Sequence, residues 1–137
     1  MRSRAADEGA GCGAARAETT YQLFIEVERP LRLRIGRLGT FALEAGRYVY
    51  TGSARRGIEA RVARHLRRRK RRHWHIDYLL AAHGARIVTV QRSALTECAA
   101  NQSVDGTIPV PGFGAGDCRE GCGAHLKRLS TKRRIES

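Results

Sequence analysis

A tyrosine, an arginine and a histidine follow one another in the first half of the chain in a pattern that suits phosphodiester hydrolysis. Tyr50 lies in a segment rich in β-forming residues, and Arg61 and His65 follow on a predicted helix. Because residues four apart share one helix face, Arg61 and His65 project together. A phenol can orient or deprotonate water, and a guanidinium can stabilise charge on a pentavalent phosphorane. The alternative is that Tyr50 is a packing residue and Arg61 a solvated charge.

Basic side chains continue beyond His65, since residues 67–72 are all Arg or Lys. On a helix, one broad side next to His65 carries five arginines: Arg61, Arg64, Arg68, Arg71 and Arg72. This side predicts a phosphate-binding track; a solvated surface helix is the alternative. The whole chain has 26 Lys and Arg against 13 Asp and Glu, a net charge of +13, which favours nucleic acid as the partner. No amphipathic or long apolar stretch predicts a membrane.

The segment that follows, residues 73–77, allows two interpretations. His73 and Asp77 are four apart, so they could pair or could approach a phosphate or a metal. In the second interpretation these residues cap and anchor a helix, and Trp74 packs in the core. We favour the second, because no metal-binding or catalytic pattern accompanies this spacing.

Cysteine usage predicts a reduced, cytoplasmic protein, since the first residues lack the apolar core of a signal peptide. A structural Zn²⁺ site is one hypothesis for the soft side chains, with the ligands Cys98, Cys118, Cys122 and His125. Reduced thiols without metal are the other, because the spacing is not that of a standard zinc knuckle.

The elements that must position these residues begin as strands and continue as helices. Apolar and polar residues alternate over 21–28 and 31–35, and further strands are expected over 40–43, 47–51 and 87–90. Helices are expected over 57–66, 74–82 and 95–103, and a glycine-rich loop over 105–123. The expected fold is α/β (α+β), a small, mostly antiparallel β-sheet flanked by about three helices. We expect a disordered leader over 1–18, one domain over 19–128 and a basic tail over 129–137.

An ordered set of short motifs over residues 19–127 resembles the GIY-YIG nucleases. Tyr50, Thr51 and Gly52, followed by the R-x-x-x-H of residues 61–65, look like the "YIG" signature and the helix after it. Thr19, Thr20 and Tyr21 look like "GIY", although Thr19 replaces the glycine. The HWHIDY string of 73–78 and the PGFG string of 111–114 resemble a compact branch of that superfamily, long catalogued as a domain of unknown function. Residues 28–47 must then form an inserted hairpin, which would lengthen the sheet or reshape the cleft.

The resemblance implies a metal-dependent endonuclease that hydrolyses nucleic acid, with DNA as the expected substrate. Glu97 would hold one Mg²⁺ or Mn²⁺, Arg61 would stabilise the transition state, and His65 would orient a tyrosine or the water. Tyr50 would be the general base and Tyr21 its neighbour, or the reverse. Asn101 would contact the phosphate. The alternative function is a nucleic-acid-binding accessory module without catalysis, and no obligate protein partner is expected.

Overall fold

The computed structural model describes residues 18–54, 56–67, 70–72, 74–114 and 123–129. Their centre is a five-stranded antiparallel sheet in the order β5-β1-β4-β7-β6. Its strands are β1 (Thr20–Val27), β4 (Gly46–Ser53), β5 (Ala85–Ser93), β6 (Gly106–Thr107) and β7 (Leu126–Leu129). The predicted antiparallel sheet is therefore confirmed.

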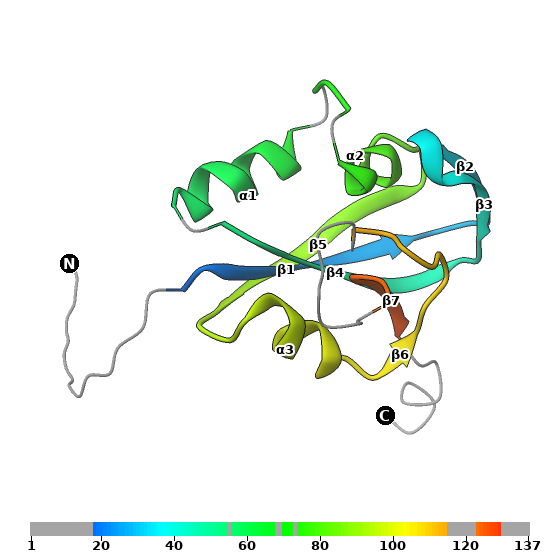
Figure 1. Ribbon diagram of the computed structural model, residues 1–137. Coiled ribbons are helices and arrows are strands. Elements are labelled where there is room, and N and C mark those ends of the chain that lie inside the picture. The colour runs from blue at the N-terminus through cyan, green and yellow to red at the C-terminus, as the bar shows by residue number, and fades with distance from the viewer. Residues whose placement is uncertain (1–17, 55, 68–69, 73, 115–122, 130–137) are drawn as a thin grey trace, which may run out of the picture.

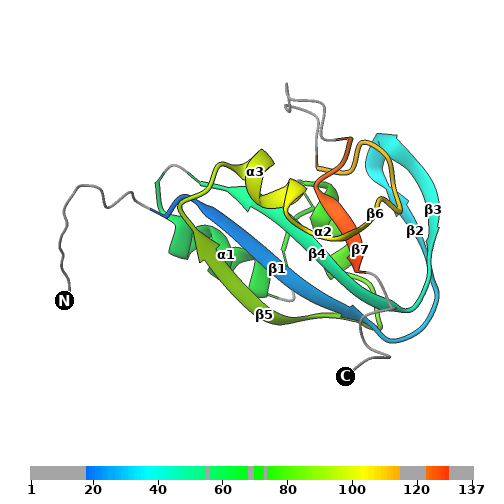
Figure 2. The same ribbon diagram turned by 90° about the horizontal axis from the view of Figure 1, so that it is seen from below.

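Alternation along β1 sets the two faces of the sheet. Tyr21, Leu23 and Ile25 are buried on one face, whereas Gln22 points to the other, where its amide donates to Thr51 Oγ1 at 3.1 Å and to the Ala100 carbonyl at 3.2 Å. Three helices cover these faces: α1 (Ile58–Leu66), α2 (His75–Leu80) and α3 (Glu97–Gln102). Figure 1 shows α1 and α2 on one side of the sheet and α3 on the other, and Figure 2 looks onto the α3 side. The sheet is thus covered on both faces, as expected for this fold class.

The predicted inserted hairpin is confirmed, and it forms a sheet of its own. Strands β2 (Leu31–Ile35) and β3 (Gly39–Leu43) pair with each other around a short 3₁₀ turn, η1 (Gly36–Leu38). The hairpin lies at one end of the main sheet, beside α2 (Figure 1). It therefore does not lengthen the main sheet. Its apolar residues pack toward the core, whereas Arg32 and Arg34 are exposed.

Several predicted boundaries differ from the structure. The strand predicted over 87–90 extends to 85–93, and the helices predicted over 74–82 and 95–103 are shorter. The loop predicted over 105–123 contains β6, and β7 was not predicted at all. Leu129 ends β7, one residue beyond the expected end of the domain. The reason is that β6 and β7 are short and are defined by backbone pairing with β4 and with each other, not by their own side chains.

Within the described residues, no helix is long and apolar enough to cross a membrane. The predicted leader over 1–18, apart from Glu18, and the predicted tail beyond Leu129 lie outside the described residues.

Candidate functional site

Two tyrosines and a histidine form one cluster beneath α1. In the pairing of β1 with β4, Tyr21 lies opposite Gly52 and Leu23 lies opposite Tyr50, so both tyrosines point to the α1 face. The Tyr21 hydroxyl and His65 Nε2 are 2.8 Å apart, a hydrogen-bond distance. The ring of Tyr50 lies 6.5 Å from that of Tyr21 and 6.1 Å from that of His65, measured between centroids. The structure thus brings together three of the residues that the sequence singled out.

Gly52 allows this arrangement, because the Tyr21 ring lies directly against its α-carbon. A β-carbon built on Gly52 would be 2.6 Å from the Tyr21 hydroxyl oxygen and 2.7 Å from Cζ. These are closer than van der Waals contact, so any larger residue must push the tyrosine aside. The glycine that follows Tyr50 and Thr51 is therefore explained by the packing of the other tyrosine.

Burial controls the protonation of this cluster. Tyr21 and His65 are each 2% exposed and Tyr50 is 8% exposed. Burial raises the pKa of Tyr21 to about 12, although the Arg61 charge and hydrogen bond oppose the shift. Burial raises the pKa of Tyr50 further, and it lowers the pKa of His65 to about 4. At neutral pH the histidine is therefore uncharged, and both tyrosines keep their protons.

Arg61 and Glu97 both contact Ser53 at the end of β4, one from each side of the sheet. Arg61 reaches from α1 and donates to the Ser53 carbonyl at 3.1 Å. Glu97 lies at the start of α3, on the opposite face, and accepts from Ser53 Oγ at 2.6 Å. Its described hydrogen bonds go to Ser53 and His125 rather than to either tyrosine. The expected single pocket of Tyr21, Tyr50, Arg61, His65 and Glu97 therefore does not form: Glu97 lies on the opposite face of the sheet from the tyrosines, and Ser53 at the end of β4 links it to Arg61.

His125 is the second partner of Glu97, a role that the sequence analysis did not predict. Its Nδ1 lies 2.5 Å from Glu97 Oε2, and the residue is 2% exposed. Burial raises the pKa of Glu97, but the hydrogen bonds from His125 and Ser53 outweigh this, and the net pKa is lowered. Glu97 is therefore an oriented carboxylate that is charged at neutral pH. No signal in the sequence pairs His125 with Glu97, because 28 positions separate them.

Asn101 is buried and does not reach the surface, where a phosphate would bind. It is 1% exposed, and its amide nitrogen donates to the Ala124 carbonyl at 2.8 Å. This bond fixes the segment just before His125. We therefore interpret Asn101 as a residue that positions the His125 segment, in place of the predicted phosphate contact.

Arg64, a predicted phosphate contact, is bonded to residues at the start of α2. Arg64 donates two hydrogen bonds of 3.0 Å to the Asp77 carboxylate, and that carboxylate also accepts from the Trp74 backbone N–H at 2.9 Å. The guanidinium carbons of Arg61 and Arg64 lie 4.6 and 4.4 Å from the Trp74 ring centroid. These contacts support the capping interpretation of residues 74–77 and leave little of Arg64 for a phosphate. His73 lies outside the described residues.

The PGFG string packs against the cluster from the edge of β4. Phe113 is fully buried, and its ring contacts those of Tyr50 and His75. The backbone N–H of Gly114 donates to His75 Nδ1 at 2.9 Å. Gly114 has a φ of +68°, and a β-carbon there would lie 3.0 Å from the Tyr50 ring. The loop therefore holds Tyr50 and the start of α2 together.

A single carboxylate with room for other oxygen ligands fits a hard divalent cation. Mg²⁺ commonly binds one or two carboxylates, and waters and substrate oxygens complete its coordination. Each oxygen of Glu97 accepts one described hydrogen bond, which leaves a lone pair on each for a metal, and the side chain is 28% exposed. No group of three or more His, Cys, Asp or Glu ligands occurs within the described residues. The residues present thus fit Mg²⁺ or Mn²⁺ on Glu97.

The zinc hypothesis remains a prediction. Two of the predicted zinc ligands, Cys118 and Cys122, lie outside the described residues. Arg68 of the predicted phosphate track also lies outside them. Cys98 lies on α3 next to Glu97, and His125 Nδ1 is already bonded to Glu97. The predicted phosphate track does not form one helix face, because α1 ends at Leu66 and Arg71 and Arg72 lie in the loop that follows it. Both are exposed, so they stay candidates for phosphate contacts.

A family model described as "Domain of unknown function DUF123" matches residues 20–137. The chain therefore belongs to the DUF123 family. No curated protein and no solved structure matches the chain. The description of the family assigns no activity, so the likeness to the GIY-YIG nucleases stays a prediction.

Proposed function

We propose that this protein is a metal-dependent endonuclease that hydrolyses phosphodiester bonds in nucleic acid, with DNA as the expected substrate. The observation that carries the proposal is the hydrogen bond between Tyr21 and the uncharged His65, beside Tyr50, at the end of the sheet where Arg61 and Glu97 both contact Ser53. The motif resemblance to the GIY-YIG nucleases supports the same reaction. We expect the protein to act in the cytoplasm, without an obligate protein partner.

Proton transfer in the proposed reaction uses the tyrosine cluster. A tyrosine can act on the attacking water only if its hydroxyl is oriented, and the uncharged His65 can orient the Tyr21 hydroxyl through their hydrogen bond. This favours Tyr21 over Tyr50 as the group next to the water, which exchanges the two roles first expected. Tyr50 then packs beside it and shields the hydrogen bond from bulk water.

The negative charge of the phosphate would be stabilised at the end of β4. The Arg61 guanidinium, which lies over Trp74 and bonds the Ser53 carbonyl, would stabilise the negative charge that develops on the phosphorane. Glu97 would hold the divalent ion, which when bound supplies Lewis-acid polarisation of the phosphate. His125 and Ser53 orient the two carboxylate oxygens.

The direct test is cleavage by purified protein of supercoiled, branched and single-stranded DNA, with Mg²⁺, with Mn²⁺ and with chelator. Tyr21→Phe should reduce cleavage by two or more orders of magnitude, because it removes only the hydroxyl that bonds His65. Tyr48→Phe is the matched control, since its hydroxyl donates instead to the Glu44 carbonyl. Equal cleavage by parent and Tyr21→Phe would remove the tyrosine from the mechanism.

A nucleic-acid-binding module without catalysis is the second candidate, and one observation favours it. Tyr21 and Tyr50 are only 2% and 8% exposed, so water and substrate have little access to their hydroxyls in this structure. This candidate predicts tight, salt-sensitive binding and no nicking of any substrate with either metal. Metal-dependent cleavage that Tyr21→Phe removes would exclude it.

A further inference from the structure

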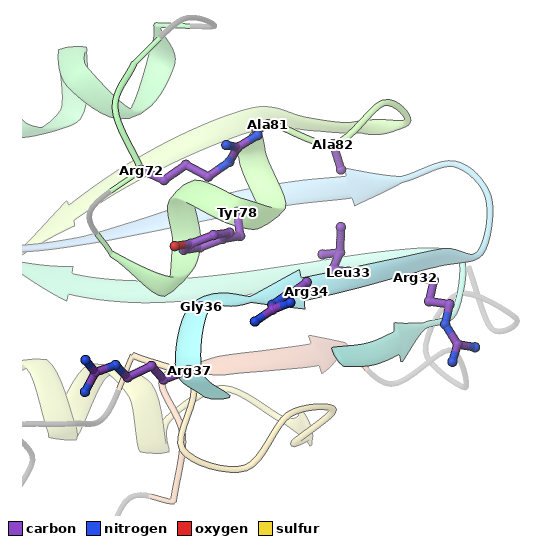
Figure 3. Close-up of a pocket in the computed structure, with 9 residues that line it drawn as sticks. All are labelled: Arg32, Leu33, Arg34, Gly36, Arg37, Arg72, Tyr78, Ala81 and Ala82. Carbon is purple, nitrogen blue, oxygen red and sulfur yellow. The ribbon is translucent and has the colours of Figure 1, made fainter. Parts of the chain in front are cut away.

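A basic cavity lies between the β2–β3 hairpin and α2, apart from the tyrosine cluster. Four arginines border it, Arg32, Arg34, Arg37 and Arg72, together with Tyr78 and a few small or apolar residues (Figure 3). We call it the arginine groove. Its volume is about 620 Å³, which falls within the roughly 300–1,000 Å³ of typical ligand sites. None of the residues predicted to be catalytic borders it.

Charge in the arginine groove is not compensated by the residues that the structure describes. All four arginines are exposed, and none has an ion-pair partner in the part of the chain that the structure describes. Among the described residues that line the groove, none is acidic. Like charges around one open cavity repel one another, and an anion that enters relieves the repulsion. The groove therefore favours a ligand with several negative charges.

Tyr78 and the floor of the groove add an apolar, aromatic component. The Arg72 guanidinium carbon lies 5.7 Å from the centroid of the Tyr78 ring. Leu33 points from β2 toward Ala82 just beyond α2, so the space between the arginines is lined by carbon (Figure 3). Unpaired bases stack on aromatic rings and guanidinium planes, whereas the bases of a duplex are already stacked. This combination fits a strand that exposes its bases.

The groove adjoins the candidate site through α2 and the hairpin. His75 and Tyr78 are three apart on α2; His75 contacts Phe113 beside the tyrosine cluster, and Tyr78 borders the groove. Leu38 of the hairpin turn lies 3.5 Å from where a β-carbon on Gly112 would be, so the hairpin also approaches the PGFG loop. One polymeric ligand can therefore contact both places.

We propose that the arginine groove binds a single-stranded segment of nucleic acid, adjacent to the phosphate on which the candidate site would act. The proposal rests on nucleic acid as the partner but not on cleavage. Phosphates would pair with the arginines of the hairpin and Arg72, and a base would stack over Tyr78 and Arg72. The inserted hairpin is thereby assigned a role in binding the substrate strand.

The test measures binding of a labelled single-stranded DNA oligonucleotide and of the matching duplex, by fluorescence anisotropy in chelator over a series of salt concentrations. Arg34→Ala with Arg37→Ala should weaken single-strand binding at least tenfold. It should also reduce the salt slope by about 1.4, at ~0.7 per lost phosphate contact. Arg29→Ala with Arg47→Ala is the matched control: both side chains are exposed, neither has an ion-pair partner among the described residues, and neither borders the groove.

Two further variants separate charge from stacking. Arg34→Lys with Arg37→Lys keeps the charge and should retain most of the affinity. Tyr78→Leu should weaken single-strand binding about tenfold more than duplex binding, whereas Tyr78→Phe should bind as the parent does. Circular dichroism and thermal unfolding of each variant verify that it is folded.

The outcomes distinguish this proposal from the nuclease proposal. Equal losses in the groove variant and the control variant would overturn the groove, because total charge alone would then explain binding. Equal losses for single strand and duplex in Tyr78→Leu would overturn the single-strand assignment. If the parent never cleaves but the groove variant loses binding, the result supports the groove proposal and not the nuclease proposal. A parent that cleaves, with a groove variant that binds and cleaves equally well, keeps the nuclease and removes the groove.

Discussion

At the scale of single residues, Glu97 is the clearest candidate for a functional role. It carries a lowered pKa, two hydrogen bonds that orient it and partial exposure to solvent. Arg64 is a contrasting example. In the sequence it resembles the other basic residues, but in the structure it forms an ion pair with Asp77.

Substitution of Glu97 tests the metal. Glu97→Gln keeps the shape and removes one negative charge, so cleavage should fall by orders of magnitude if the carboxylate holds the ion. Binding in chelator should hold or tighten slightly, because a repulsive charge is lost. Glu26→Gln is the control; it removes the same charge where Glu26 pairs with Arg86. Cleavage that survives Glu97→Gln would refute the metal assignment and leave the nuclease proposal standing.

We expect His65 to make the stability of the fold depend on pH. Its pKa is lowered from 6.5 to about 4, so between these values the unfolded chain binds a proton that the folded chain does not. Stability from this residue is complete above pH 6.5 and falls as the pH drops toward 4, by about 3 kcal/mol. Urea unfolding of the parent and of His65→Gln at several pH values measures the difference. Parallel pH profiles for the two proteins would show that His65 does not cause the loss.

The elements act as supports that bring distant residues to the same place. Pairing of β1 with β4 places the two tyrosines on one face, α1 lies over them with His65, and α3 brings Glu97 to the end of β4 from the other side. His125 continues the pairing of β7 with β4 by accepting from the Thr51 backbone N–H, and the PGFG loop pairs in turn with Gly123 and His125. The β2–β3 hairpin carries none of the three cluster residues; its Ile35 and Leu43 join the core, and its arginines border the arginine groove.

Close packing between β1 and β4 predicts the effect of a single methyl group. Gly52→Ala should lower the free energy of unfolding by about 1–3 kcal/mol, because its β-carbon would overlap the Tyr21 ring. It should also lengthen the bond from Tyr21 to His65 and so reduce cleavage. A double-mutant cycle with Tyr21→Leu measures the coupling in urea unfolding. Additive losses in that cycle would mean that the clash is relieved elsewhere.

The whole molecule carries an excess of positive charge that no single residue accounts for. The net charge of +13 predicts that binding to nucleic acid weakens steeply as salt rises, because phosphate contacts release counterions. The logarithm of the association constant should fall linearly with the logarithm of the salt concentration, with a slope of several units. A slope near zero would exclude the electrostatic binding on which both candidate functions depend.

The sequence by itself determined the fold class, the inserted hairpin and the cluster around Tyr50. Alternation and helical spacing are local patterns, so β1, α1 and the shared face of Arg61 and His65 could be predicted from neighbouring residues. Strand β7 could not, because its pairing with β4 crosses most of the domain. The motif resemblance supplied Glu97 but not its partners.

Tertiary structure alone decided which charged and polar residues are available for function. It buried Asn101, bound Arg64 to Asp77 and placed His125 on Glu97. It also brought Arg72 next to the hairpin arginines. In the sequence, Arg32 and Arg34 are the polar residues of an alternating strand, and Arg37 lies in the turn after it. The physical reason is that ion pairing and burial depend on contacts between segments far apart in the chain. Periodicity reports only which face of its own element a residue occupies.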